Sequence, residues 1–375
     1  MMEKGISPKE LVKIIKDNPD INFIGVAVTP WHAISVDASI AWLKDHGTDV
    51  KGICLISPHM DFGYVTDTSA FSNAVSLKYR YKYSNNAYRL LKRKYYFYKF
   101  VFGNRYTRKH DNPFYLLSCG MSVDIGSYVY EILPHKHIRF ILTEEGIGAF
   151  LGTVVPQKLT HNNTLLSYLK YLKQKHYRSM TDYVAKHHDI LDQRMFKQKE
   201  DGELELNKEL VPYYRDSITD KAKKTIKENK IVDLHNSVLL CTTAWIRNDI
   251  QDEEDYKVLL KVCDLLHSKG INIILKPHPR DSFFAQRAAQ LHAQPLKQSY
   301  PIEMLCAISR PKAIIGYSST ALVTAKLFWD IPAFCLSDLM EQSKMNDYYL
   351  KETGNFKKRF RNIISFPQSL AEIDI

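Results

Sequence analysis

Two adjacent carboxylates and a glycine, Glu144, Glu145 and Gly146, follow an apolar run that ends at Leu142. Neighbouring like charges and partial burial both raise the pKa of a carboxyl group. A raised pKa makes a better general base, which could take the proton from an attacking hydroxyl. Acidic residues also favour the first turn of a helix, so a helix start explains the pair equally well.

A second candidate group is His278, which stands between Pro277 and Pro279 and close to Lys276. Each proline fixes its own φ and restrains the residue before it, which predicts a stiff, extended loop. A histidine held in this way could give a proton or a strong hydrogen bond to a departing phosphate. A purely structural loop histidine is the alternative interpretation.

Three consecutive hydroxyl residues, Ser318, Ser319 and Thr320, stand where a helix is expected to begin. Free backbone N–H groups and the positive end of the helix dipole make such a position an anion site. An N-cap needs only one hydroxyl. The run of three therefore favours a phosphate ligand, with simple capping as the alternative.

All three groups follow apolar segments that the sequence predicts as strands. The expected strands are Ile21–Thr29, Lys51–Ser57, Pro113–Ser118, Ile138–Leu142, Val238–Ala244, Ile271–Lys276, Ala313–Gly316 and Ile331–Leu336. Helices are expected near His32–Gly47, Val123–Leu133, Tyr256–Lys269, Pro301–Ser309 and Thr320–Phe328. This alternation predicts parallel sheets covered on both faces, whose ligands bind beyond the carboxyl ends of the strands.

We therefore expect an α/β fold of two Rossmann-like, doubly wound domains that face a cleft. The first domain is expected over residues 1–235, and it includes a polar, basic, helical connection without a clear strand from about residue 152 to 236. The second is expected over residues 236–345, and the tail, 346–375, is expected to pack back on the first domain.

The composition favours a cytoplasmic protein. The N-terminal residues do not resemble a secretory signal, and no run of ~18 apolar residues predicts a membrane span. The six cysteines are scattered without a C-x-x-C pair, which indicates reduced core residues and no zinc site. No Asp-x-Asp triplet stands near a strand end, so no catalytic metal is expected.

The net charge of +11 is concentrated in a basic aromatic tract, Lys78–Lys109. This tract holds eleven Lys or Arg and eleven Tyr or Phe residues, but no Asp or Glu. One interpretation is a helix that buries its aromatic rings and leaves its cations in water. The other is a surface for an anionic polymer, a membrane face or a nucleic acid.

Three segments resemble, in order and context, the motifs of bacterial sialyltransferases, with the capsular polysialyltransferase family as the best match. They are FILTEEGIGAF from Phe140, ILKPHPR from Ile274 and IIGYSSTALVTA from Ile314. The resemblance extends from about Arg139 to Leu336. The segment VTPWHA, Val28–Ala33, is similar to the first loop of the related lipooligosaccharide sialyltransferases.

The resemblance implies a GT-B fold, CMP-sialic acid as the donor substrate, and inversion at the anomeric carbon without metal or cofactor. It assigns Glu145 as the catalytic base with Glu144 as its neighbour, and His278 as the acid or phosphate ligand. It places Ser318, Ser319 and Thr320 at the CMP phosphate and Glu303 at the ribose hydroxyls. Lys276 and Pro279, beside the histidine, complete the expected donor-binding set.

The expected acceptor is an acidic or galactosyl glycan of a capsule or lipooligosaccharide. The basic aromatic tract is the expected contact with that acceptor or with the inner membrane face, which would make the cytoplasmic enzyme a peripheral membrane protein. A GT-B transferase with another nucleotide-sugar donor is the first alternative. A non-enzymatic binder of anionic polymers or membranes is the second. No nucleic-acid module is recognisable, so no nucleic-acid partner is expected.

Replacing Lys92, Arg93 and Lys94 with Ser tests the acceptor role of the tract. Exposed cations act mainly through long-range attraction, which salt screens over ~10 Å at 0.1 M. We expect a higher apparent KM for acidic acceptors, most clearly at low salt, with donor binding and a neutral acceptor much less affected. Equal kinetics for both proteins at every salt concentration would assign the tract to packing alone.

Overall fold

The structure, a computed structural model, describes residues 8–18, 20–27, 29–56, 75–78, 114–118, 138–144, 189–198, 204–226, 233–242, 249–278, 284–296 and 300–375. The chain divides into two compact units, and the main division falls between Ser217 and Ile218. This point lies inside a continuous helix, α6 (Val211–Thr225), and not at the expected residue 235. Among the helices in these ranges, none has the length and apolar content needed to cross a membrane.

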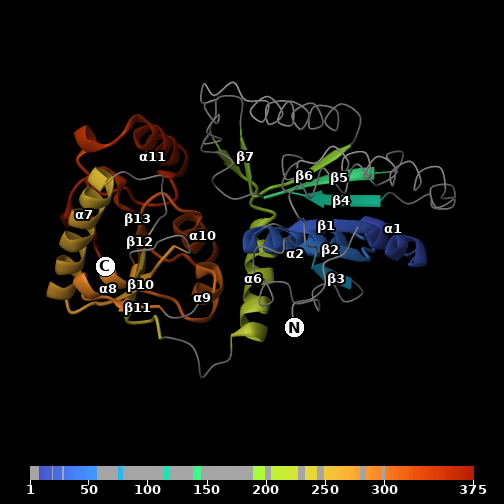
Figure 1. Ribbon diagram of the computed structural model, residues 1–375, viewed down its shortest axis with the longest axis horizontal. Coiled ribbons are helices and arrows are strands. Elements are labelled where there is room, and N and C mark those ends of the chain that lie inside the picture. Colours follow the sequence, from blue (N-terminus) through green and yellow to red (C-terminus); the bar gives the residue numbers. More distant parts are fainter. Residues whose placement is uncertain are drawn as a thin grey trace. The chain divides into compact units, whose positions relative to one another are not determined.

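The first unit contains a six-stranded parallel sheet in the order β3-β2-β1-β4-β5-β6 (Figure 1). Its strands are β1 Phe23–Ala27, β2 Gly52–Ile56, β3 Val75–Lys78, β4 Phe114–Ser118, β5 Ile138–Thr143 and β6 Ile190–Gln193. The chain builds outward from β1 in one direction and then, starting with β4, in the other. This is the doubly wound arrangement that the sequence predicts.

Two helices of this unit precede and follow β1 along the chain. Helix α1 is Pro8–Asp17, and helix α2, Pro30–Asp45, begins directly after β1. Thr29 is the N-cap of α2, because its hydroxyl accepts the His32 N–H at 3.2 Å. Gly25 in β1 permits close packing, since a Cβ there would lie 2.6 Å from Cγ1 of Val36. The start of α2 is thereby fixed at the carboxyl end of the central strand.

The expectation of no strand between residues 152 and 236 is wrong. That segment contains β6 and two further short strands, β7 Phe196–Gln198 and β8 Leu204–Leu206, which pair with each other. These strands are short, and β6 lies at a sheet edge with Ile190 37% exposed, so no buried apolar run marks them. The helix expected at Val123–Leu133 lies outside the described residues.

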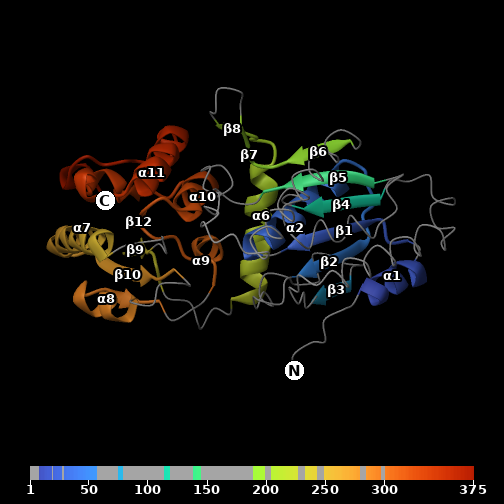
Figure 2. The ribbon, with the colours of Figure 1, turned by 45° about the horizontal axis from the view of Figure 1, so that its top comes forward.

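The second unit contains a five-stranded parallel sheet in the order β11-β10-β9-β12-β13. Its strands are β9 Ser237–Cys241, β10 Asn272–Lys276, β11 Gln294–Pro295, β12 Ala313–Gly316 and β13 Ala333–Cys335. Its helices are α7 Asp249–Ser268, α8 Phe284–Gln290, α9 Ile302–Ile308, α10 Thr320–Trp329 and α11 Asp347–Phe360. The sheet separates α7 and α8 from α9 and α10 (Figures 1 and 2).

The main core of this unit lies between the sheet and α7. Leu240, Leu275 and Ile315 come from three adjacent strands and are fully buried with Leu259 and Leu266 of α7. Leu240 pairs in register with both Leu275 and Ile315, and residues paired in this way have side chains on the same side of a sheet. The doubly wound fold predicted for the second half of the chain is therefore also confirmed.

The C-terminal tail belongs to the second unit, contrary to the expectation that it packs on the first domain. Helix α11 buries Phe356 and Phe360 completely. Tyr349 joins the same apolar core as the sheet, and its hydroxyl donates to Sδ of Met340 at 2.9 Å. The apolar face of α11 thus packs within the second unit, whose sheet is adjacent to it in the sequence.

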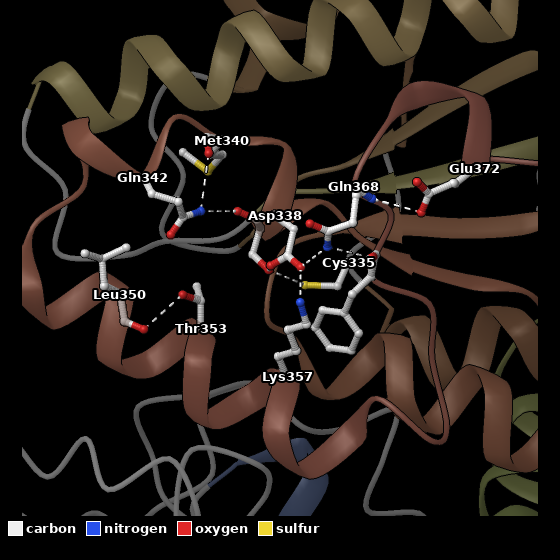
Figure 3. A network of polar contacts seen from close by, with 11 residues as sticks. Cys335, Asp338, Met340, Gln342, Leu350, Thr353, Lys357, Gln368 and Glu372 are labelled. Atoms are coloured by element: carbon white, nitrogen blue, oxygen red, sulfur yellow. Dashed lines mark hydrogen bonds and ion pairs between the residues drawn. The ribbon is translucent and has the colours of Figure 1, made fainter.

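Polar contacts join the rest of the tail to β13. Ser365 donates its N–H to the Ala333 carbonyl and accepts the Cys335 N–H, both at 2.9 Å. Asp338 follows β13 and accepts hydrogen bonds from Lys357 of α11 and from Gln368 (Figure 3). The tail is therefore part of the framework of the second sheet.

Truncating Phe360 tests the assignment of the tail. Phe360→Ala removes a fully buried ring and should lower the free energy of unfolding by about 3–5 kcal/mol. Urea denaturation measures this loss, with the exposed Lys358→Ala as control, and hydrogen exchange locates it. Faster amide exchange in β12 and β13 is expected; faster exchange confined to the first sheet would contradict the assignment.

Candidate functional site

Glu144 lies at the carboxyl end of β5, where its side chain is only 1% exposed. Its carbonyl accepts the Ser35 hydroxyl of α2 at 3.1 Å. Its carboxylate Oε2 accepts the N–H of Phe196, the first residue of β7, at 3.2 Å. Glu144 thus links three segments of the first unit, whereas Glu145 lies outside the described residues.

The charge of this carboxylate acts on two neighbouring side chains, Arg194 and Tyr214. Arg194 donates from Nε and Nη2 to the two carboxylate oxygens of Asp192 at 2.9 and 2.7 Å. This bond is the main reason why the pKa of Arg194 is raised, and the negative charge of Glu144 adds to the effect. Burial strongly raises the pKa of Tyr214, again with a contribution from Glu144. The Tyr214 hydroxyl donates to the Gln193 carbonyl at 3.2 Å. Glu144 is therefore a buried acidic group that is held by hydrogen bonds within the first unit.

The second unit presents its candidate groups around β9. This strand lies between β10 and β12, so the winding of the sheet reverses there, as at ligand sites of doubly wound folds. His278 follows β10 and is partly buried. Its backbone N–H donates to Oγ1 of Thr242 at 2.9 Å, and the Thr242 N–H donates to the Lys276 carbonyl at 3.2 Å. Pro279 lies outside the described residues.

The segment after β12 is held tightly against its neighbours. Gly316 passes close to β9, because a Cβ there would lie 2.9 Å from the Cys241 carbonyl oxygen. Tyr317 is 1% exposed, and its hydroxyl donates to the Asp255 carbonyl of α7 at 3.1 Å. Gly316 and Tyr317 therefore hold the chain between β12 and α10 against β9 and α7. The sequence motif alone does not reveal these two roles.

The three hydroxyl residues do not share one environment. Ser319 is the N-cap of α10, where its hydroxyl accepts the Ala321 N–H at 3.3 Å. Ser318 is 9% exposed and lies beside the buried Cys335 thiol. Thr320 is the first helical residue and is half-buried. The structure thus places Ser319 and Thr320 at the helix start and turns Ser318 inward.

Glu303 of α9 and Lys276 of β10 are half-buried, and their opposite charges interact. Burial raises the pKa of Glu303, while the Thr324 hydroxyl, 3.1 Å from its Oε1, and the charge of Lys276 oppose that rise. Burial lowers the pKa of Lys276, and the electrostatic effects of Cys241 and Glu303 oppose this decrease. Such a carboxyl group can accept hydrogen bonds from hydroxyls that approach the carboxyl edge of the sheet.

The described cysteines are free and buried, as expected, and Cys119 lies outside the described residues. Burial raises the pKa of the Cys241 thiol to about 12, which favours its protonated form. Within the described residues, no three His, Cys, Asp or Glu side chains form a group that could hold a metal ion. Metal independence stays a prediction.

Glu303→Gln tests the burial of this carboxyl group through the pH dependence of stability. Because the folded protein raises the pKa of Glu303, its stabilising contribution is full below the ordinary pKa of 4.5 and declines at higher pH. We expect the free energy of unfolding of the wild type to fall relative to that of the variant as the pH rises above 4.5. Urea denaturation measures the difference, with the exposed Glu205→Gln as control. A difference that stays constant with pH would contradict this environment.

Comparison with solved structures identifies several similar chains, all with low sequence identity. An alpha/beta-galactoside alpha-2,3-sialyltransferase from Photobacterium phosphoreum is 13% identical, with 94% of this chain and 100% of that chain covered and a TM-score of 0.45. The GT-B domain of a Photobacterium damselae sialyltransferase is 11% identical, with coverages of 92% and 99% and a TM-score of 0.40. A UDP-GlcNAc 2-epimerase from Methanocaldococcus jannaschii is 15% identical, with coverages of 94% and 97% and a TM-score of 0.48.

Comparison with sequences gives a more specific result. No curated protein matches the chain. Residues 72–338, however, match the family model described as alpha-2,8-polysialyltransferase (POLYST). All three motifs lie inside this range, which is more than half of the chain. The family expected from the motifs is confirmed: the chain belongs to the alpha-2,8-polysialyltransferase family and is a sialyltransferase.

Proposed function

We propose that the chain transfers sialic acid from CMP-sialic acid to a glycan acceptor that carries an acidic sugar. The observation that carries this proposal is that His278, Ser319 and Thr320 all follow strands at the carboxyl edge of one sheet, with Glu303 bonded to Thr324 of α10. A helix start binds phosphate, and a carboxyl group accepts hydrogen bonds from ribose hydroxyls. Together with family membership, this arrangement supports a CMP-sugar donor.

In the proposed reaction, the acceptor hydroxyl attacks the anomeric carbon of sialic acid from the face opposite to CMP. The bond from this carbon to the phosphate oxygen breaks, and its electron pair leaves with CMP. His278 donates a proton or a hydrogen bond to the departing phosphate, and the start of α10 stabilises the negative charge there. The proton of the acceptor hydroxyl passes to a carboxylate base. Attack from the opposite face inverts the anomeric centre.

Within the acidic pair, we propose Glu145 as the base and Glu144 as the residue that positions it. Glu144 is 1% exposed and its carboxylate accepts the Phe196 N–H, so it is poorly placed to meet an acceptor hydroxyl. Its backbone and side-chain bonds instead hold the end of β5, the point from which the chain continues to Glu145.

The remaining parts of the proposal rest on the sequence. The basic aromatic tract, Lys78–Lys109, supports contact with an acidic acceptor or with the inner membrane face, and hence a peripheral location on the cytoplasmic side. The donor-binding role of Pro279 and metal-independent transfer are proposals of the same kind. Ser318 would support the phosphate site from within, since its side chain is turned toward Cys335.

Release of CMP tests the proposed function directly. The chain is mixed with CMP-sialic acid and either a sialylated or a galactosyl acceptor, with and without EDTA, and products are analysed by mass spectrometry. Release of CMP with extension of the acceptor, unchanged by EDTA, is expected. Activity only with another nucleotide sugar would change the donor, and binding without any transfer would favour the non-enzymatic alternative.

Glu145→Gln tests the assignment of the base. Removing a general base should reduce turnover by roughly 10²–10⁴-fold, while CMP affinity measured by calorimetry stays near the wild-type value. Glu144→Ala is the comparison, because it leaves the buried Phe196 N–H without its acceptor and should lower the free energy of unfolding by about 1–3 kcal/mol. Near-normal turnover in Glu145→Gln would remove Glu145 from the reaction.

A further inference from the structure

We infer that Thr242, which follows β9, is a positioning residue that sets the place of His278 through a hydrogen bond to its backbone. The inference rests on the proposed function, in which His278 acts on the departing phosphate. Thr242 lies between the two strands that carry the donor-site motifs, since β9 pairs with β10 on one side and with β12 on the other. It is 6% exposed.

Two groups of Thr242 bind the segment that carries the histidine. Its N–H donates to the Lys276 carbonyl at 3.2 Å, which continues the pairing of β9 with β10 by one residue. Its hydroxyl oxygen then accepts the His278 N–H at 2.9 Å, two residues further along. Thr242 thus binds the chain after β10 at two points, once through its backbone and once through its side chain.

The two prolines leave few backbone donors with which the loop can be held in place. Pro277 and Pro279 have no N–H, so His278 supplies the only backbone donor in this tripeptide. The prolines limit the shape of the loop but provide no donor that could tie it to the sheet. The Thr242 hydroxyl satisfies the one available donor and thereby ties the stiff loop to the central strand.

The position of a catalytic group strongly affects rate, because a displacement of about 1 Å can reduce it by about 10²-fold. Substitution with valine keeps the size and branching of threonine but removes the acceptor oxygen. Substitution with serine keeps the oxygen but removes the methyl group. These two variants therefore separate the hydrogen bond from the packing of the side chain.

The experiment compares kcat for transfer from CMP-sialic acid in three variants. Thr242→Val should lower kcat by roughly 10–100-fold, and Thr242→Ser should restore it to within a few-fold of the wild type. Thr353→Val is the matched control, because the buried Thr353 hydroxyl lies in α11 of the same unit and donates to the Tyr349 and Leu350 carbonyls of that helix (Figure 3). Thermal unfolding of each variant confirms that it is folded.

A second measurement places both changes in one chain. If Thr242 acts through His278, Thr242→Val should cause little further loss of kcat in a His278→Ala background, because the group that it positions is already absent. The inference is overturned if Thr242→Val keeps wild-type kcat, if Thr242→Ser is as slow as Thr242→Val, or if the two losses multiply in full. Full activity in His278→Ala alone would instead contradict the proposed role of His278, and no CMP release by the wild type would contradict the proposed function itself.

Discussion

The carboxyl ends of parallel strands leave backbone groups beyond the reach of the strand ladder, and these groups must find other partners when they are buried. In both units, side chains near the candidate motifs supply such partners. Glu144 accepts an N–H from β7, Thr242 accepts one from the loop after β10, and Ser319 accepts one from the first turn of α10. Where ligands are expected, the loops are therefore held by specific hydrogen bonds as well as by apolar packing.

This constraint explains why the motifs contain residues with no evident chemistry. Gly316 allows β12 to approach Cys241 closely, and Tyr317 joins the following loop to the backbone of α7. The residues at the start of α10 are the part of this motif that we propose to bind the donor phosphate.

The sequence predicted the parts of the fold that repeat regularly. Apolar runs such as Val238–Ala244 located the buried central strands, and their alternation with helical patterns predicted both doubly wound sheets. Strand β6 escaped detection because an edge strand buries too little of its surface to show an apolar run. The partners of Thr242 and Ser318 could not be predicted, since they depend on contacts between segments distant in sequence. The packing of the tail was missed although Tyr349, Phe356 and Phe360 recur at helical spacing.

The contact of Ser365 with β13 has a consequence for solubility. β13 is the last strand of its sheet, and the open edge of such a strand can pair with another chain. Ser365 uses both its N–H and its carbonyl on that edge, and the two bonds form a single parallel bridge opposite Phe334. The tail therefore covers an edge that would otherwise be open to intermolecular β-pairing, and so acts as a built-in protection against aggregation.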